Sequence, residues 1–543
     1  MGKRVWGVAI ALIILLALLA AAVSIAFNTE IGAKSVWRIA TALDDRLSGQ
    51  YRAGTLAHGL QLGHVEYQDA ERRITINSIA TAWQWSFSPL RLDINNLAIG
   101  NVDLTQLPAP DEPLQLPQSL RLPLALNLDR VTLKQLIIRS ETATQTYAGI
   151  AIHGSSDGIN HRIRLDRAQT PAGLATMQMY LSGDHPFKLS GKVGLNSQFK
   201  AQDYTVNAYF SGILEKMMVT ANLAGGALSG QADIITTPFS PIPFTNARIR
   251  ISELDLSAFN DSAPSTRLNI LADLQPVQEI MPENIADLQV TGAISLTNKI
   301  PGAIDKNLLP VQSITGQARL DAQAQQLTAL TIRLTGKGVL TGSAINRNPL
   351  KGTFTLQAQN LNLAALHGAL QPTRLAGPLK IGFDDNRQQV HLDLASDKYS
   401  INADALIDPL KIVLYSAGLK SGKAQLALSG SMTRDQGLAY AVEGKLKSFN
   451  PALFIRIMNV NAPQPKGELP FKVYEADING GFKVEGRLKP EIAAKIQFDI
   501  QDSTYNRLPM HGGGILDIAG RQVHNSDAEL TIAGNHLEVR GAF

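Results

Sequence analysis

Apolar and polar residues alternate along most of the chain, from Arg72 onward. Successive side chains of an extended strand point to opposite faces of a sheet, so an alternation of period two predicts β-strands. Gly, Asn and Asp residues separate the alternating runs and mark turns between them. The first runs contain the pairs Ile74 and Ile76, Trp83 and Trp85, Leu92 and Ile94, and Val102 and Leu104. The pattern predicts a mainly β protein built as one extended antiparallel meander.

The clearest alternation is a leucine run between residues 120 and 128. Every second residue of this run is a leucine, namely Leu120, Leu122, Leu124, Leu126 and Leu128. The residues between them are Arg121, Pro123, Ala125 and Asn127. We therefore expect a strand here, with one apolar face and one mixed face.

Helical patterns are few and short. An apolar stripe at helical spacing, from Val36 to Leu47, predicts an amphipathic helix that either lies beside a membrane or caps the first strands. Residues 363–370 and 452–458 are further candidates, each only about two turns long. Such short elements cannot cover a large sheet. Its apolar face must either pack against a second sheet or curl into a groove that holds lipid chains, and periodicity does not choose between the two.

The longest uncharged segment lies at the N-terminus. Residues 6–27 contain no charged residue and include the apolar anchor residues Trp6, Leu15, Leu19 and Phe27. As a helix this segment spans about 33 Å, enough to cross a bilayer. Lys3 and Arg4 favour a cytoplasmic N-terminus for residues 1–5 and an exported body. A cleavable secretory signal is the alternative, but its apolar core usually has only about 7 to 15 residues. We expect a single-pass inner-membrane protein with its body in the periplasm.

Composition and motifs argue against several function classes. The 543 residues include no cysteine, which excludes disulfides and thiolate chemistry, and a net charge of +4 is too small to indicate a nucleic-acid partner. Residues 154–158 formally fit a serine-hydrolase elbow, but they lie between strand-like runs, so we expect a hairpin turn. Residues 418–423 lack the spacing and the magnesium-binding hydroxyl of a phosphate loop. The ten histidines are scattered. We predict no catalytic residue, no metal and no cofactor.

Several segments resemble the TamB branch of the AsmA-like lipid-transfer proteins. The stretch from Leu43 to Gly63 is similar to the entrance region of that family, where a short helix leads into a Gly-x-Leu turn and the first strands. The residues that carry this likeness are Gly49, Gly54, Thr55, Leu56, Gly59, Leu60 and Leu62. Residues 253–259 and 360–366 form two similar copies that lie 107 residues apart, and a weaker third copy covers 449–454. Each copy is typical of a helical turn followed by a proline-bearing loop and a new strand, like the family's repeated unit.

The resemblance implies a β-taco, which is a long sheet folded around a continuous hydrophobic groove. Residues 28–63 would form an amphipathic helix and the entrance region, and residues 64–543 the groove repeats. Family members are linked to phospholipid transport from the inner membrane toward the outer membrane, and TamB to an outer-membrane barrel partner, TamA. TamB proteins continue through further strands to a C-terminal domain, so we expect full-length relatives to extend beyond residue 543.

Two functions of different classes follow from these expectations. In the first, the protein conducts phospholipids along the groove. Its lining would include Ile74, Ile76, Trp83, Trp85, Leu120, Leu122, Leu124, Leu126 and Leu128. In the second, the protein is an assembly factor for outer-membrane β-barrel proteins that presents strand edges together with a TamA-like partner. A passive spacer with a filled interior is a third possibility. The residues identify neither the lipid, nor its direction, nor the strands at the seam.

Overall fold

The computed structural model describes residues 24–107, 115–140, 143–278, 288–347, 351–384, 386–434, 437–455, 475–520 and 522–542. Within these ranges the chain is mainly β, and its strands belong to one hydrogen-bonded sheet. Among the strand pairs that the structure describes, only β5 and β6 are parallel. The predicted mainly β fold and antiparallel meander are therefore confirmed. The chain divides into two compact units, residues 1–249 and 250–543, which are described in turn.

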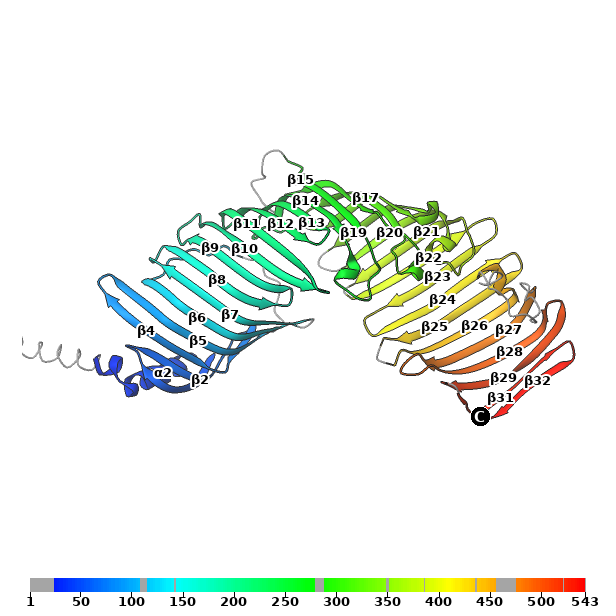
Figure 1. Cartoon of the computed structure of the whole chain (residues 1–543), viewed down its shortest axis with the longest axis horizontal. Helices are drawn as coiled ribbons and strands as arrows, with labels where there is room; N and C mark the ends of the chain where they lie inside the picture. Colours follow the sequence, from blue (N-terminus) through cyan, green and yellow to red (C-terminus); the bar gives the residue numbers. More distant parts are fainter. Residues whose placement is uncertain are drawn as a thin grey trace, which may run out of the picture. The chain divides into compact units, whose positions relative to one another are not determined.

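In the described part of the first unit, the helix α2 precedes strands that lie side by side in chain order (Figure 1). These elements are α2 (Glu30–Leu43), β1 (Leu47–Thr55), β2 (Gly59–Gln68), β3 (Arg72–Ile76), β4 (Ile79–Phe87), β5 (Leu90–Gln106), β6 (Ala125–Arg139), β7 (Thr144–Ser156), β8 (Asn160–Thr170), β9 (Gly173–Ser182), β10 (Lys188–Phe199), β11 (Gln202–Ile213), β12 (Lys216–Gly225) and β13 (Leu228–Thr236), and β14 (Phe244–Leu254) follows. The predicted amphipathic helix is thus present as α2, but it ends at Leu43, because Leu47 already begins β1.

The first strands share one central partner. Both β3 and β4 pair with β5, so they act as a single strand that is interrupted at Asn77 and Ser78. β6 then lies parallel to β5, with Ala125 opposite Arg91, which requires the chain to return along the full length of β5. From β6 to β13 each strand pairs antiparallel with the next.

The return from β5 to β6 ends in an extended segment that we call the strap, residues 117–124. The backbone N–H of Leu120 donates to the carbonyl of Gly183 at 3.1 Å, and that of Leu122 donates to Gly158 at 2.8 Å. Gly158 lies in the turn between β7 and β8, and Gly183 in the turn between β9 and β10. The strap therefore fastens the ends of two neighbouring hairpins.

The strap corrects the prediction of one strand through the leucine run. β6 begins only at Ala125, so Leu120, Leu122 and Leu124 lie outside any strand. Pro123 has no backbone N–H to donate to a ladder. The segment is extended, which accounts for its alternation, but it bonds to turn carbonyls instead of pairing with a strand.

The second unit continues the meander. Its strands are β15 (Leu268–Pro276), β16 (Val290–Asn298), β17 (Val311–Leu320), β18 (Gln325–Leu334), β19 (Val339–Arg347), β20 (Lys351–Leu361), β21 (Leu375–Asp384), β22 (Arg387–Ala395), β23 (Ser400–Ile407), β24 (Lys411–Ser421), β25 (Ala424–Thr433), β26 (Ala439–Phe449), β27 (Ala476–Arg487), β28 (Ala493–Tyr505), β29 (Leu508–Ala519), β30 (Gln522–Val523), β31 (Ser526–Ile532) and β32 (Asn535–Gly541). Its short helical turns are η1 (Leu256–Ala258), η3 (Ile304–Lys306), η4 (Thr335–Lys337), α3 (Leu363–Leu366) and η5 (Pro451–Leu453).

The three sequence copies fold alike, each as a capped helical turn after a strand. The turns η1, α3 and η5 begin after Asp255, Asn362 and Asn450, and each of these side chains accepts a hydrogen bond from the backbone N–H two residues later. Such caps satisfy donors that the start of a helix leaves open. The helical turns predicted at 363–370 and 452–458 are thus present in shorter form, and residues 456–458 lie outside the described part of the chain.

A buried threonine closes the first two copies. The Thr373 hydroxyl accepts from the backbone N–H of Leu363 at 2.9 Å and donates to the carbonyl of Leu361 at 2.8 Å. Thr266, 107 residues earlier, makes the two corresponding bonds. Thr373 is 8% exposed and Thr266 only 2%. We call this arrangement the threonine clip.

The helical turns are joined to one another and hold the small core of this unit. Asp305, in η3, accepts a hydrogen bond from the backbone N–H of Gly368 at 3.0 Å, and this bond lowers the pKa of the Asp305 carboxyl. Gln371 N–H donates to the carbonyl of Phe454 at 3.0 Å, beyond η5. Beneath α3 lies a cluster of buried side chains, formed by Leu334, Ala358, Leu361, Leu375 and Leu394. The core therefore sits where helical turns cover the strand ends.

Replacing Thr373 by valine tests the threonine clip. Valine has a similar shape but cannot bond to Leu363 or Leu361, and a buried backbone group left unpaired costs about 1–3 kcal/mol. We expect faster amide hydrogen exchange in peptides that cover residues 360–375. Thr355→Val, on an exposed position of β20, is the matched control and should leave exchange unchanged. Equal exchange in both variants would show that the clip does not stabilise this turn.

Candidate functional site

The strand register places apolar residues of the first unit on one face of the sheet. Cross-strand partners lie on the same face, so a row of partners can be followed from strand to strand. One such row runs from β4 to β13 and consists of Trp83, Ile94, Leu128, Gly154, Ile163, Met179, Gly191, Phe210, Val219 and Ile234. No residue in it is charged or polar. We call the face that carries such rows the apolar face.

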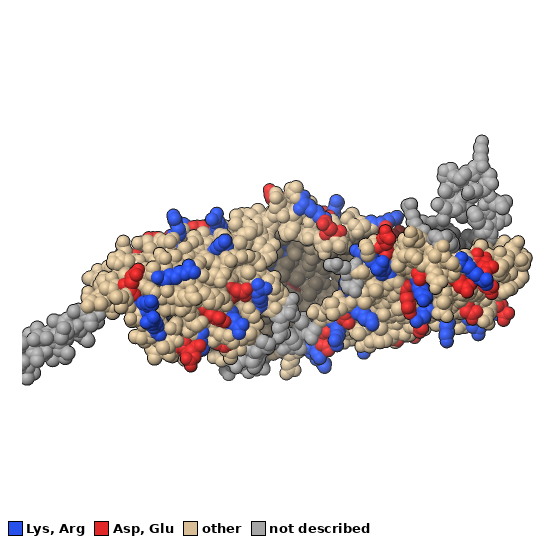
Figure 2. All heavy atoms as spheres, turned by 90° about the horizontal axis from the view of Figure 1, so that it is seen from below, with Lys and Arg blue, Asp and Glu red and all other residues tan. Residues whose placement is uncertain are grey.

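The opposite face of the same strands is polar. One row on this side runs through His153, Arg164, Gln178, Lys192, Tyr209, Thr220 and Asp233. Figure 2 shows Lys and Arg side chains interspersed with Asp and Glu over the surface in view. The two faces of the sheet therefore differ sharply in chemistry, as the sequence alternation predicts.

The second unit has an apolar face of the same kind. One row crosses β19 to β32 through Gly342, Leu356, Leu379, Leu392, Ala403, Ala417, Leu428, Gly444, Phe482, Phe498, Gly514, Ala528 and Val539. A second row lies beside it and consists of Ala344, Phe354, Ile381, Val390, Ala405, Leu414, Gly430, Val442, Val484, Ile496 and Leu516. Neither row contains a polar side chain.

Most side chains in these rows are only half-buried. In the second row all are of intermediate exposure, and in the first the fully buried members are few, such as Leu356 near α3. The inward residues of a β-sandwich are instead mostly buried by the facing sheet. Among the described residues one sheet contains the strands, and helical turns cover its apolar face at the strand ends. The apolar face is thus left partly open over most of the described strands.

Aromatic rings lie across glycines on this face. A Cβ added at one residue of a cross-strand pair would collide with the ring of the other in the pairs Gly191–Phe210, Gly352–Phe383 and Gly444–Phe482. The absence of a side chain on the glycine lets the ring of Phe482 extend over the neighbouring strand, an arrangement that shields the glycine backbone. The rings therefore add apolar area along the sheet without adding a second layer.

Four of the predicted lining residues belong to the apolar face. Trp83 and Leu128 lie in one row, and Trp85 and Leu126 lie in the next, joined through Leu92. The indole N–H groups of both tryptophans donate to the carbonyl of Leu56, at 2.8 Å and 3.0 Å. Each indole thus places its polar atom on the backbone and leaves its rings as apolar surface.

The other predicted lining residues lie elsewhere. Ile74 and Ile76 are in β3, beyond the interruption at Asn77, where Ile74 faces Tyr67 and Leu104. The strap holds Leu120, Leu122 and Leu124 outside the strand rows, and Leu122 is 39% exposed. The apolar rows of β7 to β13 and of β19 to β32 are the larger part of the face, and sequence reasoning assigned none of their residues to it. The sequence of these strands shows the same alternation of apolar and polar residues. Which of the two sets lies on the apolar face becomes clear only from the pairing register of the strands.

Comparison with known proteins gives no match. No protein-family model, curated protein or solved structure matches this chain. The resemblance to the TamB branch therefore remains a prediction from the residues quoted for it. The function must be argued from the faces of the sheet and from the N-terminal region.

The N-terminal anchor prediction falls mostly outside the described residues, which begin at Ser24. Trp6, Leu15 and Leu19 lie outside them. Phe27 is described, and its ring lies against that of Trp85 with 5.9 Å between centroids. Within the described part of the chain, no helix combines the length and the apolar character needed to cross a membrane.

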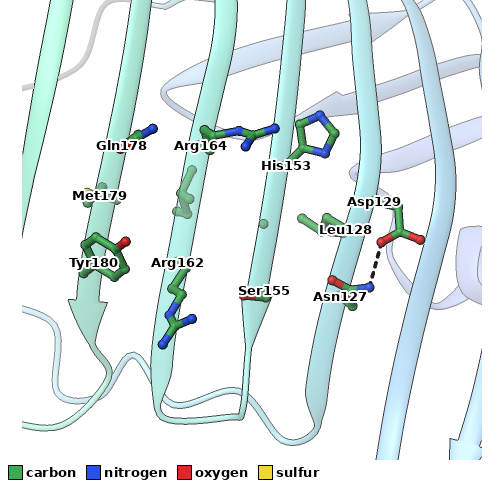
Figure 3. Close-up of a pocket in the computed structure, with 12 residues that line it drawn as sticks. Asn127, Leu128, Asp129, His153, Ser155, Arg162, Arg164, Gln178, Met179 and Tyr180 are labelled. Atoms are coloured by element: carbon green, nitrogen blue, oxygen red, sulfur yellow. Dashed lines mark hydrogen bonds between the residues drawn. The ribbon is translucent and has the colours of Figure 1, made fainter.

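A polar depression of about 420 Å³ lies on the opposite face of β6 to β9 (Figure 3). Asp166, which does not line the depression, lies 2.8 Å from the His153 Nε2 atom and 2.7 Å from the Arg164 Nε atom. The guanidinium of Arg162 lies 5.8 Å from the ring centre of Tyr180. The basic groups are thus engaged with neighbours on an exposed surface, where such pairs are worth little energy.

The motifs that resemble catalytic elements fold as hairpin turns. Residues 154–158 end β7 and turn into β8, as predicted. The Ser156 hydroxyl accepts from the backbone N–H of Gly158 at 3.0 Å. Hydrogen bonds from the Asn160 side chain and backbone lower the pKa of Asp157 to about 2. Residues 418–423 likewise lead from β24 into the turn before β25. Among the described residues, no three His, Asp or Glu side chains group as metal ligands would.

Replacing Gly444 by alanine tests the packing of aromatic rings on the apolar face. The new Cβ would collide with the Phe482 ring, and overpacking of this kind costs about 1–3 kcal/mol. We expect a lower midpoint of urea unfolding for the second unit, and partial recovery in the double variant Gly444→Ala, Phe482→Leu.

Gly481→Ala provides the matched control. Gly481 is the cross-strand partner of Lys445 on the polar face, and the only atom near an added Cβ is the carbonyl oxygen of Gly444 at 3.5 Å. This variant should unfold close to the midpoint of the native protein. If both alanine variants were equally destabilised, the cost would come from backbone conformation and not from the ring.

Proposed function

We propose that this protein holds the acyl chains of phospholipids on its apolar face and lets them move along it. The observation that carries the proposal is the uninterrupted apolar row of each unit, half-buried and flanked by a polar opposite face. Apolar area that the protein itself does not cover favours an apolar ligand, at about 25 cal/mol for each Å² removed from water. A contiguous apolar surface that a protein leaves partly open often marks a binding site.

Movement along the face requires no covalent chemistry. Neighbouring positions of a row, such as Leu379, Leu392 and Ala403, offer similar apolar contacts, so a chain can shift by one strand without meeting a charged side chain. Head groups stay in water at the rim. The energy of binding is spread over many residues, so no single one is essential.

The setting that we propose follows from the sequence. The uncharged segment 6–27 anchors the chain in the inner membrane, with residues 1–5 in the cytoplasm and the body in the periplasm. The sheet curls into a hydrophobic groove, as in the β-taco of the TamB branch, and phospholipids pass toward the outer membrane. The half-open apolar face supports this arrangement over a sandwich, and the TamB resemblance supplies the direction.

Adjacent residues of β25 allow a sharp test of lipid contact. Leu428 belongs to the apolar row, whereas Ala427 faces Lys445 on the polar side. A photo-crosslinking amino acid at Leu428 should form adducts with phospholipid in cells, and the same amino acid at Ala427 should not. Mass spectrometry of the purified adducts identifies the ligand. Protein adducts at Leu428, with no lipid, would instead favour the assembly-factor function.

Charged substitutions test whether the apolar face retains lipid. We expect the triple variant Leu379→Asp, Leu428→Asp, Phe498→Asp to lose co-purifying phospholipid by roughly fivefold or more, because each unpaired charge in an apolar site costs several kcal/mol. The control is Thr355→Asp, Ala427→Asp, Gln497→Asp, which adds the same three negative charges on the polar face. Circular dichroism checks that both variants keep their strands. Equal lipid in the two variants would contradict the proposal.

A further inference from the structure

The helix α2 exposes a stripe of large apolar side chains. Ile31 is 79% exposed, Ile39 57% and Leu43 83%, and Val36 is 41% exposed beside them. Spacings of three, four and eight residues bring these side chains to one side of the helix. Soluble surfaces rarely show so many large apolar residues together without a partner. We call these four residues the α2 stripe.

The orientation of α2 on the sheet is fixed from its other side. Ala33 is 1% exposed, and the indole N–H of Trp37 donates to the carbonyl of Gly49 at 3.2 Å. The Glu30 carboxylate accepts from the backbone N–H of Gly54 at 3.3 Å. The helix therefore cannot roll to bury the stripe without breaking these contacts.

The charges of α2 favour a lipid surface as the partner of the stripe. Lys34 and Arg38 are exposed, lie one turn apart and border the stripe on the side of Ile31. Glu30, the only acidic residue of the helix, faces the sheet. A helix with an apolar side and adjoining basic residues is typical of those that lie in the plane of a membrane, where long basic side chains reach the head groups. Anionic lipids attract such residues.

An aromatic pocket adjoins the start of α2. It has a volume of about 760 Å³ and is lined by Ser24, Phe27, Asn28, Ala57, His58, Gln84, Trp85 and Phe87. None of these is Asp, Glu, Lys or Arg. The Trp85 ring lies between those of Phe27 and Phe87, at 5.9 Å and 6.4 Å, and Phe87 is 73% exposed. The size is within the usual range for small-ligand pockets, about 300–1,000 Å³.

We infer that α2 lies in the head-group boundary of a lipid bilayer with its stripe inserted, and that the aromatic pocket receives an acyl chain from that surface. The pocket is continuous with the apolar face through Trp85, whose row includes Leu92 and Leu126. A chain that enters at Phe87 therefore meets the first apolar row directly. The role of the pocket rests on the proposed lipid-conducting function, whereas the docking of α2 rests on its own exposure and charge.

The absence of cysteine makes site-specific labelling of the full chain direct. The full chain is reconstituted in vesicles of phosphatidylethanolamine and phosphatidylglycerol that contain a phospholipid brominated on its acyl chains. Single cysteines at Ile39, at Phe87 and at Gln357, an exposed position of β20, carry an environment-sensitive fluorophore. We expect a blue shift and bromine quenching at Ile39 and Phe87, and neither at Gln357. An unquenched label at Ile39 would contradict the docking of α2 on the bilayer. An unquenched label at Phe87 would contradict the binding of an acyl chain in the aromatic pocket.

Two variants separate α2 docking from simple proximity to an N-terminal anchor. Ile31→Ser with Leu43→Ser should strongly reduce quenching at Ile39, and Lys34→Gln with Arg38→Gln should reduce it in these vesicles but not in vesicles of phosphatidylcholine alone. Unchanged quenching in both variants would contradict the inference. A blue shift without bromine quenching would indicate a protein partner or a second copy, and also overturns it. Lipid adducts at Leu428 report on the proposed function separately, because they do not depend on α2.

Discussion

Register is the constraint on which the rest of the structure depends. Each strand obtains its backbone hydrogen bonds from its neighbours, and a slip of one residue would move every side chain to the opposite face. Leu428 and Ala427 illustrate this effect. Leu428 lies in a row without polar side chains, whereas the adjacent Ala427 is paired with Lys445 on the polar face. The same pairing repeated over many strands turns a local alternation into two continuous faces of different chemistry. No single strand could produce such a surface.

The apolar face is stable in the strand ladder but incompletely covered. Hydrogen bonding between strands satisfies the backbone without a second layer, so the sheet does not require a facing sheet to pair its polar groups. Within the described residues, cover comes from helical turns such as α3, whose Leu363 and Leu366 pack against the buried Leu361 and Leu375. Away from them the side chains stay half-buried. The apolar area that remains open is the strongest physical reason to expect an apolar ligand, because an equal area closed by protein would already have gained that energy.

The alternation was sufficient to predict a mainly β antiparallel meander but not to assign residues to faces. Trp83 and Leu128, both predicted as lining residues, lie in one row of the register, and the 107-residue spacing marks two turns that share caps and clips. The leucine run was predicted as one strand because an extended segment and a paired strand share the same two-residue period of side chains. Pro123 lacks the backbone N–H that a paired strand would donate. Faces also depend on irregular positions. β5 contains an extra residue opposite β4 near Trp83, and such bulges shift the parity of all residues beyond them.

The glycines of the apolar face influence the shape of its surface. A Cβ added at Gly444 would meet the ring of Phe482 first, and one added at Gly191 would meet both the carbonyl oxygen of Gln178 and the ring of Phe210. A leucine at either position would force the ring outward and raise a ridge across the row. With glycine the ring lies along the sheet, so the face stays apolar and level where rows cross from strand to strand. A level surface is unnecessary for a packed core, where interlocking side chains are favoured, but it suits a flexible chain that must shift from one strand to the next.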